Sequence, residues 1–125
     1  MQFAVWMVFL AATLPYLAVG LAKSTTRYDN AAPRLYLSKL EGWRARADWA
    51  QRNHFEAFPP FAAGVILAEI AHAPQPSINH AAAAFVLIRL FYTAVYLAGF
   101  ATLRTLVFAA GVYCVIRLFE LAATS

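Results

Sequence analysis

The sequence predicts an all-α membrane protein, a single bundle of four transmembrane helices. The chain has 125 residues, of which 62% are hydrophobic and 13% charged. That is about half the charged share of an ordinary soluble domain. The charges are concentrated in one segment, and the stretches outside it are long and apolar enough to cross a bilayer. A soluble domain of this size could not bury so much apolar surface, so most of the chain must face lipid.

The same composition excludes several other classes of protein. A chain this apolar is not disordered, and the single Cys114 excludes a scaffold held by internal disulfides. The net charge of +4 would favour nucleic acid as the partner of a soluble chain. Here the basic residues lie between apolar stretches, so we predict a membrane-lipid partner and no nucleic acid.

The first transmembrane helix is predicted over residues 2–22. Residues 1–22 carry no charged side chain, and about 20 residues are needed to cross roughly 30 Å of hydrocarbon. No Lys or Arg precedes this apolar run, which favours a retained span over a cleaved signal peptide.

Residues 23–52 are predicted to form a loop in water. Eleven of the sixteen charged residues fall between Lys23 and Glu56. The basic members of the loop are Lys23, Arg27, Arg34, Lys39, Arg44, Arg46 and Arg52. The positive-inside rule therefore places this loop in the cytoplasm, in contact with anionic lipid, and both termini outside.

Three further spans are predicted over residues 53–72, 81–102 and 103–123. The first of these carries Glu56 and Glu69, and Glu56 must face protein or water because it lies at membrane depth. Two prolines at positions 74 and 76 predict the turn that follows it. In the last span, Arg117 and Glu120 are three residues apart, which favours an ion pair at the interface.

Ionisable residues at membrane depth are candidates for a functional site because burying them is costly. Arg89 lies near the middle of the third span, and Arg89, Tyr92 and Tyr96 follow i, i+3, i+7 spacing. This spacing places them within an arc of about 60° on a helix. A similar stripe on the second helix, continued back into the residues before its span, comprises Arg46, Trp49, Asn53, Glu56 and Pro60, with Arg52 beside Glu56.

Because the second and third helices are antiparallel, the two polar stripes are expected to meet in the inner half of the membrane. Arg104 reaches the same level at the start of the fourth helix. An ion pair between Arg89 and Glu56 that locks the bundle is one interpretation. One carboxylate cannot satisfy Arg52, Arg89 and Arg104 together, however, so the second interpretation is a pocket for a ligand that carries carboxylates and an amine.

At these residues the sequence resembles the MAPEG family, the membrane-associated proteins in eicosanoid and glutathione metabolism. The stretch Asn53-His-Phe-Glu56-Ala-Phe-Pro-Pro60 is similar to the family's second-helix signature. Arg89, Tyr92 and Tyr96, followed by Arg104, resemble its third-helix signature and the arginine at the start of its fourth helix. The resemblance covers most of the chain, with both motifs in order.

The resemblance implies a homotrimer of four-helix subunits with glutathione, as co-substrate, bound between neighbours near the cytoplasmic face. Carried over by position, Glu56 would face the ammonium group of glutathione, and Arg52 and Asn53 its carboxylates or backbone. Arg104 would lie beside the sulfur as the catalytic residue. The cradle would be completed by Arg89, Tyr92 and Tyr96.

The implied activity is that of a membrane-bound glutathione transferase or peroxidase. A cation and a helix N-terminus both stabilise a thiolate, and Arg104 offers both. The thiolate would attack hydrophobic electrophiles or lipid hydroperoxides that enter from the bilayer. We expect the host membrane to be a bacterial cytoplasmic membrane.

Two departures from the family pattern keep a second function open. Trp49 stands where many members carry an arginine one turn before the asparagine, and Phe108 stands where some catalytic members have a tyrosine. The family also includes a member that binds lipid without catalysis. A non-catalytic lipid-binding, ligand-binding or scaffold protein of the same fold is therefore the alternative.

Other sites and functions are less consistent with the sequence. We expect His54 at the cytoplasmic helix end and His72 and His80 beside the outer turn, at interface or capping positions, so no pair would bind haem or metal at depth. A small multidrug transporter would need an acidic residue in the first span, and residues 1–22 contain none.

Overall fold

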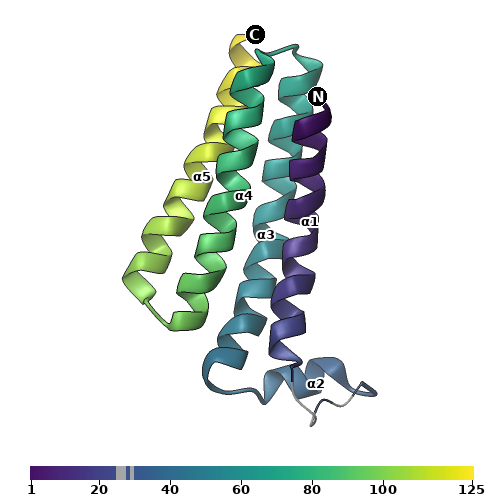
Figure 1. The fold of residues 1–125 in the computed structure, drawn as a ribbon, viewed down its shortest axis with the longest axis vertical. Coiled ribbons are helices and arrows are strands. Elements are labelled where there is room, and N and C mark those ends of the chain that lie inside the picture. The colour runs from purple at the N-terminus through teal and green to yellow at the C-terminus, as the bar shows by residue number, and fades with distance from the viewer. Residues whose placement is uncertain (25–27, 29) are drawn as a thin grey trace.

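The computed structural model describes residues 1–24, 28 and 30–125. Among these residues the chain forms five helices and no strand. The helices are α1 (Gln2–Ala22), α2 (Pro33–Ser38), α3 (Gly42–Ile70), α4 (Gln75–Ala98) and α5 (Ala101–Thr124). Four of them are long and run along one another, whereas α2 is a short helix between α1 and α3 (Figure 1). The prediction of an all-α chain is confirmed.

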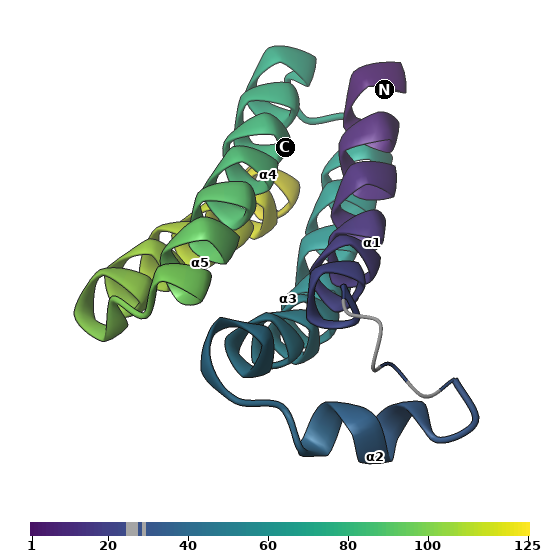
Figure 2. The same ribbon diagram turned by 60° about the horizontal axis from the view of Figure 1, so that its bottom comes forward.

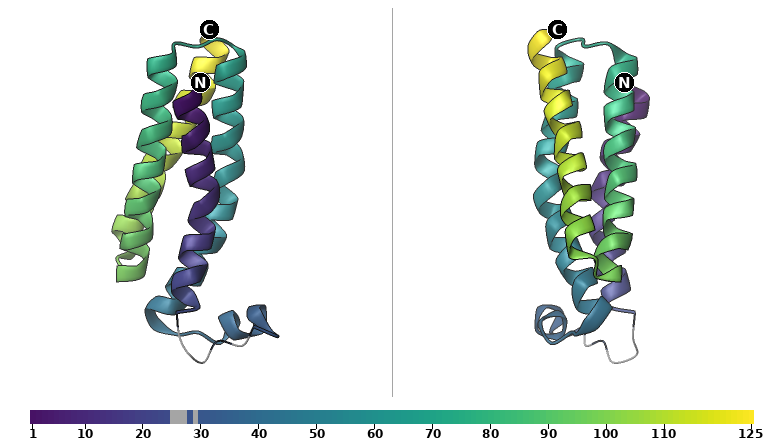
Figure 3. Two further views of the ribbon diagram at one scale, coloured as in Figure 1. Left: turned by 45° about the vertical axis from the view of Figure 1, so that its right-hand side comes forward. Right: turned by 90° about the vertical axis from the view of Figure 1, so that its left-hand side faces the viewer.

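Helix α3 packs against the other three long helices, α1, α4 and α5. The helices α4 and α5 lie side by side, and α1 also contacts α4. Both termini and the turn between α3 and α4 lie at one end of the bundle (Figures 1 and 3). The helix α2 lies across the other end, as Figure 2 shows. The basic segment and the two termini are therefore at opposite ends of the protein.

Small side chains allow the helices to approach one another closely. On α1 the buried alanines Ala4, Ala11 and Ala18 are seven residues apart, so they lie on one face of the helix. Between α3 and α4 the rings of Phe61 and Phe85 stack at 4.0 Å. In a membrane, helices associate through such close packing because lipid supplies no hydrophobic driving force between them.

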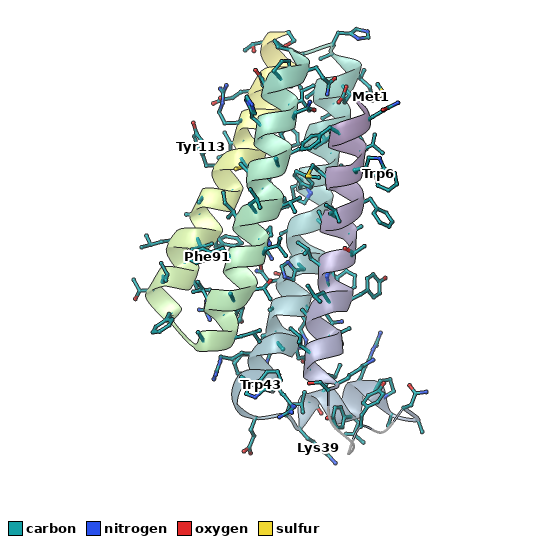
Figure 4. All side chains as sticks on the ribbon, viewed as in Figure 1. Met1, Trp6, Lys39, Trp43, Phe91 and Tyr113 are labelled. Atoms are coloured by element: carbon teal, nitrogen blue, oxygen red, sulfur yellow. The ribbon has the colours of Figure 1, made fainter. Side chains whose placement is uncertain are left out.

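Large apolar side chains cover the outside of the bundle. Trp6 and Tyr113 are both exposed and point away from it on opposite sides (Figure 4). Three helices, α1, α4 and α5, are long and apolar enough to cross a membrane. These features fit an integral membrane protein whose outer surface contacts lipid. The predicted ion pair between Arg117 and Glu120 forms near the end of α5 and is confirmed.

The predicted count of four spans is not confirmed. Within the part of the chain that the structure describes, α3 is not among the helices apolar enough to cross a membrane. Asn53, His54 and Glu56 interrupt the apolar run that was expected over residues 53–72. Helix α3 nevertheless packs along the three apolar helices. Its polar residues therefore lie at the same depth in the membrane as the apolar side chains of those helices.

The ends of the helices also differ from the predicted boundaries. The predicted loop over residues 23–52 contains α2 and residues 42–52 of α3, and its Arg27 lies outside the described residues. The predicted third span, 81–102, corresponds to α4, which begins earlier, at Gln75. It also ends earlier, at Ala98, because Gly99 adopts a φ of 84° and forms a left-handed cap. The predicted fourth span, 103–123, lies within α5.

Helices α3 and α5 approach each other closely at Gly64. A Cβ atom built on Gly64 would lie 3.0 Å from Cβ of Leu118 and 3.3 Å from the ring of Phe119. Leu118 is itself fully buried. A larger residue at position 64 would therefore push α5 away from α3.

We expect Gly64→Ala to lower the free energy of unfolding by about 1–3 kcal/mol, the usual cost of overpacking a close contact. The measurement is the unfolding midpoint of the protein in detergent micelles. Gly20→Ala is the matched control, because nothing lies within 4 Å of a Cβ atom at Gly20. The control should be stabilised by up to about 1 kcal/mol through helix propensity. Equal midpoints for the two variants would contradict the close packing of α3 on α5.

Candidate functional site

Two adjoining pockets lie among α3, α4 and α5. The first has a volume of about 220 Å³, and its lining is mostly apolar, with Asn53, Glu56 and Arg89 as its polar residues. The second has a volume of about 260 Å³ and is lined by Asn53, Tyr92, Tyr96, Arg104, Thr105 and Phe108. Asn53 and Phe108 line both pockets, so the two spaces share a wall.

The residues predicted to form the site are, with one exception, brought together around these pockets. Asn53 and Glu56 come from α3, and Arg104 comes from the first turn of α5. The lining residues from α4 are Arg89, Tyr92 and Tyr96. Helical spacing predicted this arrangement, because residues three, four or seven apart share one face of a helix.

The exception is Arg52, which lines neither pocket. Its side chain is 65% exposed and forms an ion pair with Asp48, one turn earlier on α3, at 3.3 Å. Asp48 is buried, with its side chain 4% exposed. Arg52 therefore pairs with a buried carboxylate one turn earlier on α3, and none of the ion pairs among the described residues joins it to Glu56, one turn later.

The other residues of the predicted stripe on α3 have three different environments. Arg46 donates a hydrogen bond from Nε to the carbonyl oxygen of Leu97 at 3.0 Å, which ties α3 to the end of α4. Trp49 is exposed. Pro60 lines the first pocket, and as a proline it cannot donate to the carbonyl oxygen of Glu56 within the helix.

Arg89 is 2% exposed, the most deeply buried cation of the site. Its Nε and Nη2 atoms lie 3.2 and 2.8 Å from Nδ1 of His54. Its guanidinium carbon lies 4.2 Å from the centroid of the Tyr92 ring. The predicted ion pair with Glu56 does not form, because none of the ion pairs among the described residues joins these two side chains. A neutral imidazole occupies the place expected for the carboxylate.

His54 was expected at an interface or capping position, and the structure shows that this expectation is wrong. The residue is 2% exposed, and its Nε2 atom lies 2.8 Å from Oγ1 of Thr93. A signal in the sequence could have located it. His54 is seven residues before Phe61 and fourteen before Ala68, both fully buried, and this spacing places all three on the inner face of α3.

The second pocket gathers aromatic rings around a cation. The guanidinium carbon of Arg104 lies 4.7 Å from the centroid of the Tyr96 ring. Tyr96 meets Tyr92 edge to face, with centroids 5.5 Å apart, and Phe108 lies 6.3 Å from Tyr92. Arg104 also lies within the first turn of α5, where the helix dipole adds positive potential. The pocket therefore suits an anionic group.

Two polar groups of the site lack a partner within the described residues. Among the described residues, Glu56 has no ion pair, although it lines the first pocket. Oδ1 of Asn53 is buried without a hydrogen-bond partner, and a buried acceptor in that state is destabilising by about 1–3 kcal/mol. A ligand with both donors and anionic groups would satisfy the carboxylate, the amide and the two guanidinium groups together.

Comparison with protein families gives one finding. The family model for the MAPEG family matches residues 3–124, nearly the whole chain. Comparisons with curated proteins and with solved structures give no match.

The contact between Arg89 and His54 should make a measurable contribution to stability. We expect Arg89→Ala and His54→Ala each to lower the free energy of unfolding by about 1–3 kcal/mol, because each leaves a buried partner unsatisfied. The double variant should be less destabilised than the sum of the two, with a coupling energy of about 1–3 kcal/mol. Chemical unfolding in micelles measures all three variants.

The control cycle uses Arg117 and Glu120, an exposed ion pair on α5. Its coupling energy should be at most about 1 kcal/mol. A coupling energy for Arg89 and His54 no larger than that of the control would contradict the buried contact.

Proposed function

The chain belongs to the MAPEG family, and from this premise we propose that it is a membrane-bound, glutathione-dependent transferase or peroxidase. Its substrates would be hydrophobic electrophiles or lipid hydroperoxides. One observation carries the proposal: two guanidinium groups, Arg89 and Arg104, line adjoining pockets, and neither forms an ion pair among the described residues. Such a site has a net positive charge and favours an anionic ligand.

Glutathione has the groups that this site lacks. Its ammonium group would lie against Glu56, and one of its N–H groups would donate to the buried Oδ1 of Asn53, which is without a partner. Its carboxylates would be bound by Arg89 in the first pocket and by the phenol groups of Tyr92 and Tyr96 in the second. Arg52 is exposed, so the proposal assigns it to a backbone carbonyl oxygen of glutathione that lies outside the pockets, toward a neighbouring subunit.

The sulfur of glutathione would lie beside Arg104. A free thiol has a pKa of about 8.5, which a nearby cation and a helix N-terminus lower. The resulting thiolate attacks an electrophilic carbon, and the leaving group departs with its bonding electrons. With a hydroperoxide it attacks the terminal oxygen, the O–O bond breaks, and the alkoxide takes up a proton. A second glutathione then reduces the sulfenic acid to a disulfide and water.

The apolar part of the first pocket suits the hydrophobic co-substrate. Phe85, Phe108, Val112 and Val115 line it, and Asn53 and Phe108 also line the second pocket. A molecule from the bilayer that occupies this space would meet the sulfur at the shared wall. Proximity of this kind contributes much of the rate acceleration in a two-substrate reaction.

We also propose that the protein forms a homotrimer and has a defined orientation in the membrane. The exposed apolar side chains of α1, α4 and α5 are available for contacts between subunits of a homotrimer as well as for lipid. The basic end of the bundle would face the cytoplasm of a bacterial inner membrane, with both termini outside. Cross-linking in native membranes would test the trimer, and protease accessibility would test the orientation.

We expect glutathione to bind saturably to the purified protein and to show thiolate absorbance in the ultraviolet. Arg104→Ala should remove that absorbance and lower turnover about 10²-fold, the usual effect of losing one electrostatic stabiliser. The matched control is Arg117→Ala, which removes an arginine from the same helix outside both pockets. Binding without thiolate or turnover in the unaltered protein would leave a non-catalytic ligand-binding protein of the same fold.

Glu56→Gln should weaken glutathione binding about tenfold or more, because the variant loses a charge-assisted hydrogen bond to the ammonium group. An analogue of glutathione that lacks this ammonium group provides the control, since the two proteins should bind it with equal affinity. Calorimetric titration measures both ligands. A variant that loses affinity for both ligands equally would contradict the assigned role of Glu56.

A further inference from the structure

We propose that His54 is a positioning residue that holds Arg89 in the orientation in which it receives the anionic ligand. The inference rests on the proposed function in one respect, the use of glutathione as the ligand. The hydrogen bonds, the burial and the aromatic contact around Arg89 carry it.

The hydrogen bonds fix the protonation state of His54. A guanidinium group can only donate, so Nδ1 of His54 must accept from Arg89. The proton of the neutral ring is then on Nε2, which donates to Oγ1 of Thr93 at 2.8 Å. The hydroxyl of Thr93 in turn donates to the carbonyl oxygen of Arg89 at 3.0 Å. Every member of this buried network has a partner, and each bond has a single direction.

The same bonds fix the guanidinium group of Arg89. Its Nε and Nη2 atoms are directed to His54 on one edge, and the Tyr92 ring lies 4.2 Å from its central carbon. An arginine has five N–H donors, of which His54 engages two, so the remaining donors are available where Arg89 lines the first pocket. A ligand that binds there does not have to immobilise the side chain, which removes part of the entropic cost of binding.

An imidazole suits this role because it orients the cation without neutralising it. Among the described residues, no carboxylate lies within 4.0 Å of Arg89. His54 is also the residue next to Asn53, which lines both pockets. The contact of His54 with Arg89 and Thr93 therefore sets the position of α3 relative to α4 at the point where the two pockets meet.

Three variants of His54 and Thr93 separate positioning from simple filling of space. In His54→Asn, Oδ1 can accept from Arg89 in place of Nδ1, so glutathione affinity should stay within about threefold of the unaltered protein. In His54→Leu the space is filled but the acceptor is lost, and affinity should fall about tenfold or more. Thr93→Val, which removes only the support of the ring, should give a smaller loss of about threefold.

The matched controls are His80→Asn and His80→Leu, because His80 is exposed on the same bundle and lines neither pocket. Both controls should bind glutathione as the unaltered protein does. Equal affinities for His54→Asn and His54→Leu, in variants that unfold at similar temperatures, would overturn the proposal.

A second measurement does not depend on glutathione. In ¹⁵N-labelled protein in micelles, the Nε–H signal of Arg89 should exchange slowly with water in the unaltered protein and in His54→Asn. In His54→Leu the signal should be lost. If glutathione fails to bind the unaltered protein, the proposed function fails and this signal alone decides the positioning role. The same Nε–H signal in all three proteins would overturn it.

Discussion

The structure depends on how a cation is accommodated at membrane depth. Arg89 is 2% exposed, and an unpaired charge in that position would cost several kcal/mol. The protein satisfies it with the ring of His54, the face of Tyr92 and a hydroxyl on Thr93 that ties the network to the backbone of α4. None of these groups carries a negative charge. The charge of Arg89 is thus stabilised by hydrogen bonds and remains available to a ligand.

This requirement explains why α3 differs from the other long helices. It supplies His54 to the core, Asn53 and Glu56 to the pockets and Arg46 to the end of α4, so it is less apolar than a helix that faces lipid. The apolar helices pack closely around it, and α1 contributes the buried small side chains Ala4, Ala11 and Ala18 to this packing. The polar residues of the site are therefore held in place by the close packing that the small residues of the bundle allow.

The faces of the helices could be predicted from the sequence, whereas the partners of the long side chains could not. Spacing alone placed Arg89, Tyr92 and Tyr96 on one stripe, and the pockets contain all three. Arginine has several rotatable bonds, so its position on a helix does not determine which neighbour it reaches. Arg52 pairs with Asp48, and Arg89 bonds to His54 instead of Glu56. The end of α4 was missed for a different reason, because the left-handed conformation of Gly99 is a single-residue feature.

The two pockets also limit which groups could stabilise a thiolate in the proposed reaction. Phe108 has no hydroxyl group, and the hydroxyl of Thr105 already donates to the carbonyl oxygen of Ala101 at 3.2 Å. The remaining donors that line the second pocket are Arg104, the phenols of Tyr92 and Tyr96, and the amide of Asn53. Of these, only Arg104 is a cation, and it lies in the first turn of α5, where the helix dipole has the same sign. The chemistry would therefore depend on one side chain in the second pocket, while recognition of the ligand is distributed over both pockets.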